Sequence, residues 1–398
     1  MTMTRRDLLG RAMLGGLMLA GGLAVSGLAG PALADDTIKI GAPFNLTGAL
    51  SSLDAPALNG AKLAAEQINA AGGVLGKKIE LVVYDTKTDP TVIASTGSQL
   101  INQDKVPVIV GFTDSDSVLA LAPIAEKAGI PFVTPGATSP KLPDQVGPNM
   151  FLACFGDNVQ AAAGAEFLKD TLKAKKVYLL TDNSTEYTTL LSSYFKQAFE
   201  KGGGTLSLED NYKSGDKSFT AQITKLKALG EKPDALYIAA MPDDIGLIVK
   251  QLRQSGVTQP IVGGDGYDTP LLLSVGGTAA NGVYYSTHAF MSEDSTAAIK
   301  KFYADYQTAF KTPPDNAFAA LGYDTVGLVA DAIKRAGSAD PAKIREALAA
   351  TKGYQGITGA ISYRPGVRVP DKTVALIGVK GGKLTLSGEV LPTWVPAP

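Results

Sequence analysis

The chain has 398 residues, of which 45% are hydrophobic and 19% are charged, and its formal net charge is -1. A globular chain of this length is too long for one ordinary domain, so two domains are expected. The near-neutral charge excludes the strongly basic footprint of a nucleic-acid-binding domain, so no nucleic-acid partner is expected.

The chain contains one cysteine, Cys154, and one histidine, His288. A single cysteine excludes an internal disulfide, and the two residues together are too few for a zinc site built from His and Cys ligands. We interpret Cys154, which lies in an apolar run, as a buried small hydrophobe. His288 has no catalytic-triad context and is interpreted as a surface or hinge residue. No metal and no cofactor is expected.

The first 34 residues are typical of an export signal. Residues 4–9, TRRDLL, resemble a twin-arginine motif, and an uncharged run rich in Gly and Ala follows to residue 30. Residues 32–34, ALA, supply a small-x-small cleavage pattern. A membrane anchor is the alternative, which the weak hydrophobicity of the run disfavours. We expect an exported protein that is soluble after cleavage near Ala34, by either the twin-arginine or the general route.

From residue 35 onward, short apolar runs typical of buried strands alternate with amphipathic segments typical of helices. Repeated β–α units predict parallel sheets with helices on both faces, and right-handed crossovers make each set a doubly wound layer. The predicted strands are 38–41, 79–84, 107–110, 130–133, 150–155, 177–180, 205–208, 235–239, 261–263 and 283–286. The predicted helices include 59–70, 92–101, 158–172, 188–201, 219–229 and 244–254.

The last part of the chain departs from this alternation. It contains three predicted helices, 296–310, 318–335 and 341–349, and three short edge or antiparallel strands, 361–363, 374–379 and 383–386. These pieces are too few and too helical for a third domain, so we expect them to complete the two earlier layers.

The chain would then cross between two lobes more than once, which predicts a hinge of several strands and a cleft between the lobes. The expected boundaries are 35–154 plus 287–366 for lobe 1 and 155–286 plus 367–398 for lobe 2.

The stretch from Gly111 to Pro140 contains two neighbouring strand-to-helix turns, GFTDSDS and TPGAT. Open parallel sheets bind ligands at the carboxyl ends of their strands. A helix N-terminus there offers free N–H donors that suit a small anion such as a carboxylate. The two turns therefore predict a pocket that contains Ser115, Ser117 and Thr138. The alternative that Ser115 or Ser117 is only an N-cap stays open.

No catalytic motif is present. Residues 72–78, GGVLGKK, lack the first glycine and the Ser/Thr of a phosphate-binding loop and are better explained as a helix-ending turn. No G-x-S-x-G elbow occurs. Asp114 and Asp116 lack the glycine and glutamate of a calcium loop and are interpreted as solvated turn residues. We therefore expect no enzyme and assign no catalytic residue.

Five segments of the mature chain share a pattern with a known family: 38–48 (IKIGAPFNLTG), 59–73 (NGAKLAAEQINAAGG), 84–90, 111–140 and 263–266 (GGDG). Together they resemble the leucine/isoleucine/valine-type periplasmic solute-binding proteins of ABC importers. The resemblance covers nearly all of the mature chain. It implies the type I Venus-flytrap fold: an α/β protein of two doubly wound lobes with parallel-sheet cores, joined by a multi-strand hinge.

The resemblance also implies a ligand site. In this family a serine of the first turn and an alanine and a threonine of the second turn hold the ligand's α-carboxylate. Ser115, Ala137 and Thr138 match these positions, and Gly136 lies beside them.

An acidic residue after a later strand holds the α-ammonium in the family, and Asp265 matches it. A tyrosine that closes over the ligand from the second lobe is matched by Tyr187. The alternatives are a turn or cap role for Asp265 and a lobe-surface position for Tyr187.

The positions around the ligand's variable group are matched by four residues, Leu53, Thr113, Met241 and Phe318. Each is also compatible with an ordinary core position. Leu53 and Met241 replace aromatic residues that are common in the leucine binders. Thr88 and Asp114 stand where some members carry a cysteine pair. These departures leave the shape of the side-chain pocket open.

We therefore expect a periplasmic, monomeric binding protein that delivers a small-molecule ligand, an amino acid with an apolar or branched side chain, to the membrane permease of an ABC importer. Alternatives are the same fold binding an aromatic carboxylate, amide or urea, a ligand-sensing module, and an exported enzyme as the last choice. A ligand without an ammonium group would leave Asp265 without a charge partner. The role of Asp265 therefore distinguishes an amino-acid ligand from an aromatic carboxylate, amide or urea.

Overall fold

The computed structural model describes residues 37–293 and 295–398. The expected export signal, residues 1–34, lies outside these ranges. Residues 37–398 form one compact unit. No helix within the described ranges is both long enough and apolar enough to cross a membrane.

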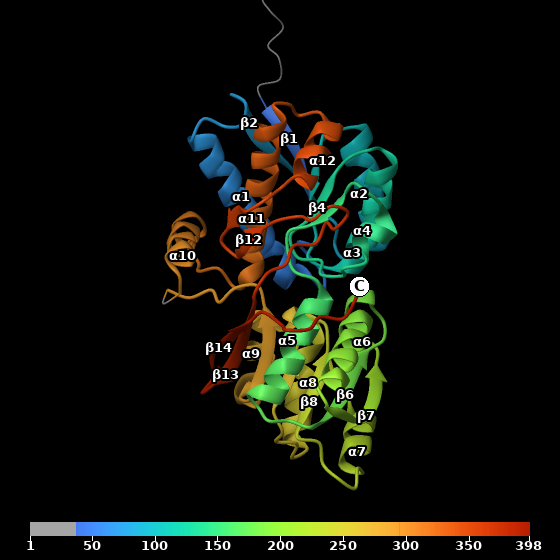
Figure 1. Ribbon diagram of the computed structural model, residues 1–398. Helices are drawn as coiled ribbons and strands as arrows, with labels where there is room; N and C mark the ends of the chain where they lie inside the picture. Colours follow the sequence, from blue (N-terminus) through green and yellow to red (C-terminus); the bar gives the residue numbers. More distant parts are fainter. Residues whose placement is uncertain (1–36, 294) are drawn as a thin grey trace, which may run out of the picture. The chain divides into compact units, whose positions relative to one another are not determined.

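The first sheet has five strands in the order β2-β1-β3-β4-β5, and all its paired strands run parallel. Helices α1 to α4, α11 and α12 lie around it (Figure 1). Its strands are β1 (Thr37–Phe44), β2 (Lys78–Asp85), β3 (Ile109–Val110), β4 (Phe132–Thr134) and β5 (Met150–Leu152). Its helices are α1 (Ser51–Ala70), α2 (Pro90–Asn102), α3 (Ser115–Lys127), α4 (Leu142–Val146), α11 (Ala317–Ala336) and α12 (Pro341–Ala349).

The second sheet has seven strands in the order β14-β13-β10-β9-β8-β6-β7. The last two strands of the chain, β13 and β14, are antiparallel, which confirms the prediction for 374–379 and 383–386. Its strands are β6 (Lys176–Asp182), β7 (Thr205–Tyr212), β8 (Ala235–Ala239), β9 (Ile261–Gly263), β10 (Val283–Thr287), β13 (Val374–Lys380) and β14 (Lys383–Val390). Its helices are α5 (Asp157–Asp170), α6 (Glu186–Lys201), α7 (Thr220–Lys227), α8 (Pro242–Gln254) and α9 (Pro270–Gly276).

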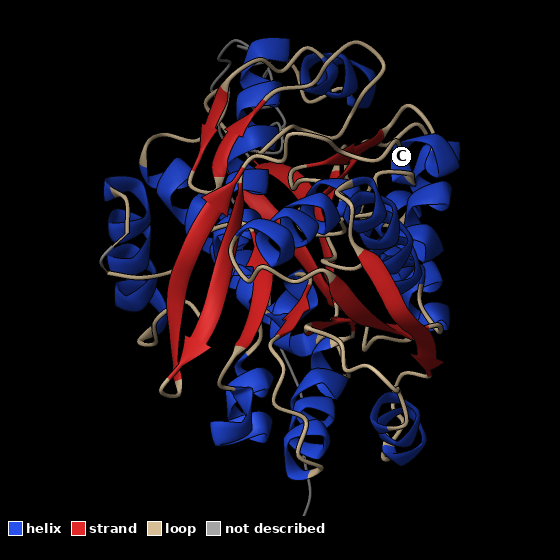
Figure 2. Ribbon diagram, turned by 60° about the horizontal axis from the view of Figure 1, so that its bottom comes forward, coloured by secondary structure: helices blue, strands red, loops and turns tan. Residues whose placement is uncertain are grey.

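The remaining elements are short or peripheral: the 3₁₀ turns η1 (Asp265–Tyr267) and η2 (Gly277–Ala280), helix α10 (Ala297–Phe310), and the hairpin β11 (Tyr354–Gly356) with β12 (Gly359–Ile361). Figure 2 shows the strands lying between helices, as a doubly wound layer requires. The α/β class with two parallel-sheet cores is thus confirmed. Helices α4 and α9 and strand β11, which are short, were not predicted from the sequence.

The tail of the chain completes both layers. One hydrophobic core joins residues from β1 to Cys154 with others from Phe318 to Tyr363. The cores around the second sheet join residues between Phe155 and Tyr285 with β13. The chain therefore passes between the layers after β5, after β10 and before β13. We call the first sheet with its helices lobe 1 and the second sheet with its helices lobe 2.

Helix α1 begins at Ser51 instead of residue 59, with Pro56 inside it. A proline has no N–H for the carbonyl four residues earlier, which here is that of Ser52. Asn316 Nδ2 donates to Ser52 O at 2.9 Å and takes the place of this missing donor. Asn316 is the residue before α11. A residue distant in sequence therefore supplies the hydrogen bond that Pro56 cannot make within α1.

Helices α1 and α11 approach closely through two glycines. A Cβ atom on Gly60 would lie 1.7 Å from Ala319 O, and one on Gly322 would lie 1.9 Å from Ala57 O. Backbone atoms cannot yield as a flexible side chain does, so both positions need a residue without a Cβ atom.

Gly60→Ala is expected to lower the free energy of unfolding by about 1–3 kcal/mol, the usual cost of overpacking a core. This loss would occur although alanine is the better helix former. Chemical denaturation at neutral pH measures it. The matched control is Gly230→Ala, whose Cβ atom would meet nothing within 4 Å. Equal effects of the two variants would contradict the steric explanation.

Candidate functional site

The turns after β3 and β4 lie side by side at the carboxyl edge of the first sheet, as predicted. The N-cap of α3 is Asp114, whose carboxylate accepts from Ser117 N at 2.8 Å. The N-cap alternative for Ser115 or Ser117 is therefore wrong. Ser115 Oγ instead accepts from Ser139 N at 3.2 Å and ties the two turns together. Asp114 is buried, so its interpretation as a solvated turn residue is also wrong, whereas Asp116 is exposed.

Asn45, at the end of β1, explains why the Asp114 carboxylate is tolerated inside the protein. Its Nδ2 donates to Asp114 Oδ2 at 3.3 Å, and its Oδ1 accepts from Thr88 N at 2.9 Å. Asn45 thus joins Thr88 and Asp114, the two positions at which some members of the family that the sequence resembles carry a cysteine pair. Burial raises the pKa of Asp114 to about 6, against the hydrogen bonds from Ser117.

A second buried carboxyl group, Asp54, lies in the first turn of α1. Thr113 Oγ1 and Asn45 N lie 2.6 Å from its two oxygens. Burial, and then the charge of Asp114, raise the pKa of Asp54 to about 8. Asp54 and Asn45 were not among the predicted site residues, because nothing in their local sequence shows which distant segments they meet.

Asp265 is the centre of a hydrogen-bond cluster in lobe 2. Its Oδ1 accepts from Tyr187 Oη and from Gln160 Nε2, each at 2.9 Å, and its Oδ2 lies 3.0 Å from His288 Nε2. Only 2% of Asp265 and 7% of Tyr187 is exposed, which rules out a lobe-surface position for Tyr187. The N-cap of η1 is Gly264, without a side-chain cap, so Asp265 is not a cap either.

His288 lies in the second crossing, which agrees with the hinge interpretation, but it is buried. Its ring stacks on Phe155 at a centroid distance of 3.9 Å and meets the Phe318 ring edge-on at 5.7 Å. Burial lowers the pKa of His288, although its bond to Asp265 opposes the shift. The carboxylate only accepts, so the neutral imidazole donates from Nε2.

A neighbouring acid, Asp157, shares the Gln160 amide, which donates to Asp157 Oδ1 at 2.9 Å. Burial, and then the charge of Asp265, raise the pKa of Asp157 well above its usual value. Two carboxylates this close cannot both ionise easily in a buried site. Asp157 is thereby favoured as the neutral acid of the pair.

A small cavity of about 10 Å³, here called the inner cavity, lies between the lobes. It brings together seven of the ten predicted ligand residues, namely Leu53, Thr113, Thr138, Tyr187, Met241, Asp265 and Phe318. Leu50, Asp114, Pro242 and Gly266 also line it and were not predicted.

The other three predicted residues do not line the inner cavity. Ser115 is buried in the contact with Ser139. The Ala137 N–H is engaged by Thr134 Oγ1 at 2.9 Å. Gly136 lies under the ring of Phe318, which would be 2.7 Å from a Cβ atom there. A ligand group would reach these three residues only after a local shift.

The two lobes touch at the lip of the cleft. Glu186 N, in the first turn of α6, donates to Asp116 Oδ1 at 3.2 Å. The Glu186 carboxylate accepts from Ser139 Oγ at 3.2 Å and from Gln145 Nε2 at 3.0 Å. These contacts join the two lobes beside the cleft.

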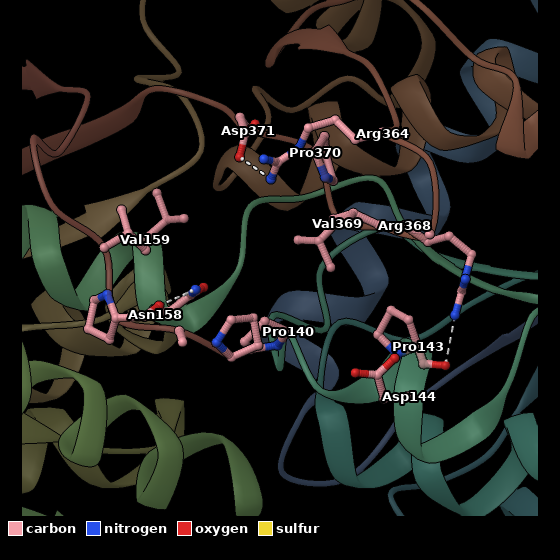
Figure 3. A pocket seen from close by; sticks show the side chains of 16 residues that line it. Pro140, Pro143, Asp144, Asn158, Val159, Arg364, Arg368, Val369, Pro370 and Asp371 are labelled. Atoms are coloured by element: carbon pink, nitrogen blue, oxygen red, sulfur yellow. Dashed lines mark hydrogen bonds and ion pairs between the residues drawn. The ribbon is translucent and has the colours of Figure 1, made fainter.

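Figure 3 shows a different cavity of about 410 Å³, beside the third crossing and the last residues of the chain. None of the predicted ligand residues lines it. Its arginines already have partners: Arg364 pairs with Asp371 at 3.3 Å, and Arg368 donates to Pro143 O at 3.0 Å. The polar groups of this cavity hold the crossing in place, so it is the weaker candidate for a ligand site.

The raised pKa of Asp54 predicts a pH-dependent stability. The folded state binds this proton more tightly than the unfolded state, so the stabilisation is present below pH about 4 and is lost as the pH rises through about 8. Asp54→Asn removes the stabilisation that comes from proton binding by the Asp54 carboxyl group. Between pH 5 and pH 9 the wild type is expected to lose stability relative to the variant, by at most about 1.4 kcal/mol per pH unit.

Urea unfolding at both pH values measures this difference. Asp170→Asn, at an exposed position, is the control and should track the wild type. If the difference between the wild type and Asp54→Asn does not change with pH, Asp54 does not bind the proton.

Residues 37–383 match the family model described as periplasmic binding protein. The chain is 30% identical over 334 residues to the leucine-, isoleucine-, valine-, threonine- and alanine-binding protein of Pseudomonas aeruginosa, covering 83% of this chain and 87% of that protein.

Solved structures give the same result. The leucine binding protein LivK of Thermotoga maritima is 35% identical, with a TM-score of 0.83 over 89% of this chain and 99% of that one. LivJ of Streptococcus pneumoniae, in complex with isoleucine, is 33% identical, with a TM-score of 0.82 over 89% and 98%. A solute binding protein of Rhodopseudomonas palustris with bound 3,4-dihydroxybenzoic acid is 26% identical, with a TM-score of 0.79 over 91% and 99%. The chain belongs to the periplasmic binding protein family.

Proposed function

We propose that this chain captures an α-amino acid with an apolar side chain in the cleft between its lobes and delivers it to the membrane permease of an ABC importer. The observation that carries the proposal is the Asp265 carboxylate. Its three partners, Gln160, Tyr187 and His288, are all neutral donors. None of the residues that line the inner cavity, all within the described chain, is a lysine or arginine. These hydrogen bonds leave the Asp265 carboxylate without an ionic partner among the lining residues, and the ammonium group of an amino acid would supply one.

The distribution of the lining residues supports a closing mechanism. Leu53, Thr113, Thr138 and Phe318 belong to lobe 1, whereas Tyr187, Met241 and Asp265 belong to lobe 2. A ligand that contacts both groups binds the closed state more tightly and shifts the population towards it. We propose lobe boundaries of 35–154 plus 287–366 and 155–286 plus 367–398, with Ser115, Gly136 and Ala137 joining Thr138 around the carboxylate when ligand enters.

Membership of the family supports a proposal for the partner and the compartment. We propose that the protein acts in the periplasm as a monomer and that its closed form is what the permease recognises. A sensing module of the same fold is the alternative, and genes for permease and ATPase subunits beside its own would favour transport. A catalysed change in the bound ligand would indicate an enzyme instead.

An aromatic carboxylate is the second candidate ligand, because the Rhodopseudomonas palustris structure holds one. Such a ligand carries a carboxylate as an amino acid does, but it supplies no ammonium group to pair with Asp265. The inner cavity therefore favours the amino acid.

Asp265→Asn is expected to weaken leucine binding at least about 30-fold, because removing one partner of a buried charge pair costs 2 kcal/mol or more. Calorimetric titration of protein that has been unfolded and refolded, to release bound ligand, measures the affinity. Binding of 4-methylpentanoate, which is leucine without its amino group, should not weaken.

Asp331→Asn, which removes a carboxylate on the outside of α11, is the control. A change of less than threefold in leucine affinity for Asp265→Asn would refute the role of Asp265. Preferential binding of benzoate-like acids would instead favour the second candidate.

A further inference from the structure

A cavity of about 240 Å³, here called the outer chamber, adjoins the inner cavity. The two share Leu50, Asp114 and Met241. The outer chamber lies between the lobes as well, because Thr185, Ser214 and Asp243 of lobe 2 face α2 and α3 of lobe 1 across it. It is therefore a second compartment of the same cleft.

The walls of the outer chamber are mainly apolar. Ala49, Leu50, Pro90, Ile93, Ala120 and Met241 line it. Such a surface binds hydrocarbon, and each buried CH₂ group contributes about 0.8 kcal/mol.

The charged groups in the walls have one sign. Asp114, Asp116 and Asp243 line the chamber, and none of its lining residues, all within the described chain, is Lys, Arg or His. Asp116 Oδ1 accepts from Glu186 N at 3.2 Å, and the described residues that line the chamber offer it no cationic side chain. A ligand with a negative charge at this end would be repelled.

The passage between the compartments is formed by Leu50 and Met241, because both line each cavity. Met241 is an unbranched, adaptable side chain whose Sδ lies 3.9 Å from Thr185 Oγ1. The inner cavity has room for about one water molecule. A long side chain that starts at Asp265 therefore finds space beyond Met241.

We propose that the outer chamber receives the far end of the ligand's side chain, so that the cargo is an α-amino acid with a long apolar side chain and no negative charge at its tip. This inference rests on the proposed function, because it takes the amino group to be held at Asp265.

The ligands that test it share the amino-acid head group and differ in their side chains. Leucine and 2-aminooctanoate have the same head group, and the second has two more CH₂ groups in its side chain. 2-Aminooctanedioate ends the same carbon chain in a carboxylate. Calorimetric titration of refolded protein is expected to show 2-aminooctanoate binding about tenfold more tightly than leucine. It should bind 2-aminooctanedioate at least tenfold more weakly than 2-aminooctanoate.

Two variants fill the chamber from different elements: Ala120→Phe from α3, and Ala49→Phe from the loop before α1. In each, the affinity for 2-aminooctanoate relative to that for valine should fall at least tenfold. Ala49 is exposed, so its variant keeps the test open if Ala120→Phe does not fold. Ala128→Phe, at the exposed C-cap of the same helix α3, is the matched control and should keep the wild-type ratio.

The outcomes separate this inference from the proposed function. If leucine binds but 2-aminooctanoate binds more weakly than leucine, or if both filling variants keep the wild-type ratio, the inference is overturned and the amino-acid function stands. If no amino acid binds the refolded protein, the proposed function fails and the inference fails with it.

Discussion

Burial of the Asp265 carboxylate is the constraint on which the cleft depends. An unpaired buried charge is costly, and this one is compensated by donors from three separate places: Gln160 on α5, Tyr187 on α6 and His288 after β10. The Asp265 carboxylate therefore holds together the first turn of α5, the first turn of α6 and the residue after β10. His288 then supports Phe318, which lines the inner cavity from lobe 1. One buried charge thus links the core of lobe 2 to the opposite wall of the site.

The crossings between the lobes carry a second buried polar network. Lys372, in the third crossing, donates to Ala153 O at 3.2 Å and to Thr358 Oγ1 at 2.5 Å. Thr358 in turn donates to Asp324 of α11 at 2.6 Å. Burial lowers the pKa of Lys372, and the charge of Asp324 opposes this shift. The network joins the first crossing, at Ala153, to the third crossing, at Lys372.

Carboxyl groups dominate the cleft, yet burial distinguishes them. Asp54 and Asp157 lie where burial favours their neutral form, whereas Asp116 is exposed at the lip. Asp265 has neutral donors on both oxygens. No Lys or Arg is among the described residues that line the inner cavity or the outer chamber, and the acidic groups of the cleft differ from one another by burial and by their hydrogen bonds.

The sequence by itself determined the alternation of strands and helices, the two adjacent polar turns and the antiparallel tail, because periodicity and turn chemistry are local. Its resemblance to a family added Asp265 and Tyr187, which no local pattern would have selected. Only the tertiary structure decided that Asp114 caps α3 and is buried against Asn45. It also decided that His288 hydrogen-bonds Asp265, and that Asn316 donates to the Ser52 carbonyl, which Pro56 leaves without a donor. Each of these depends on which distant segments meet. Their hydrogen bonds and burial are set by the packing of the two layers and not by neighbouring residues in the chain.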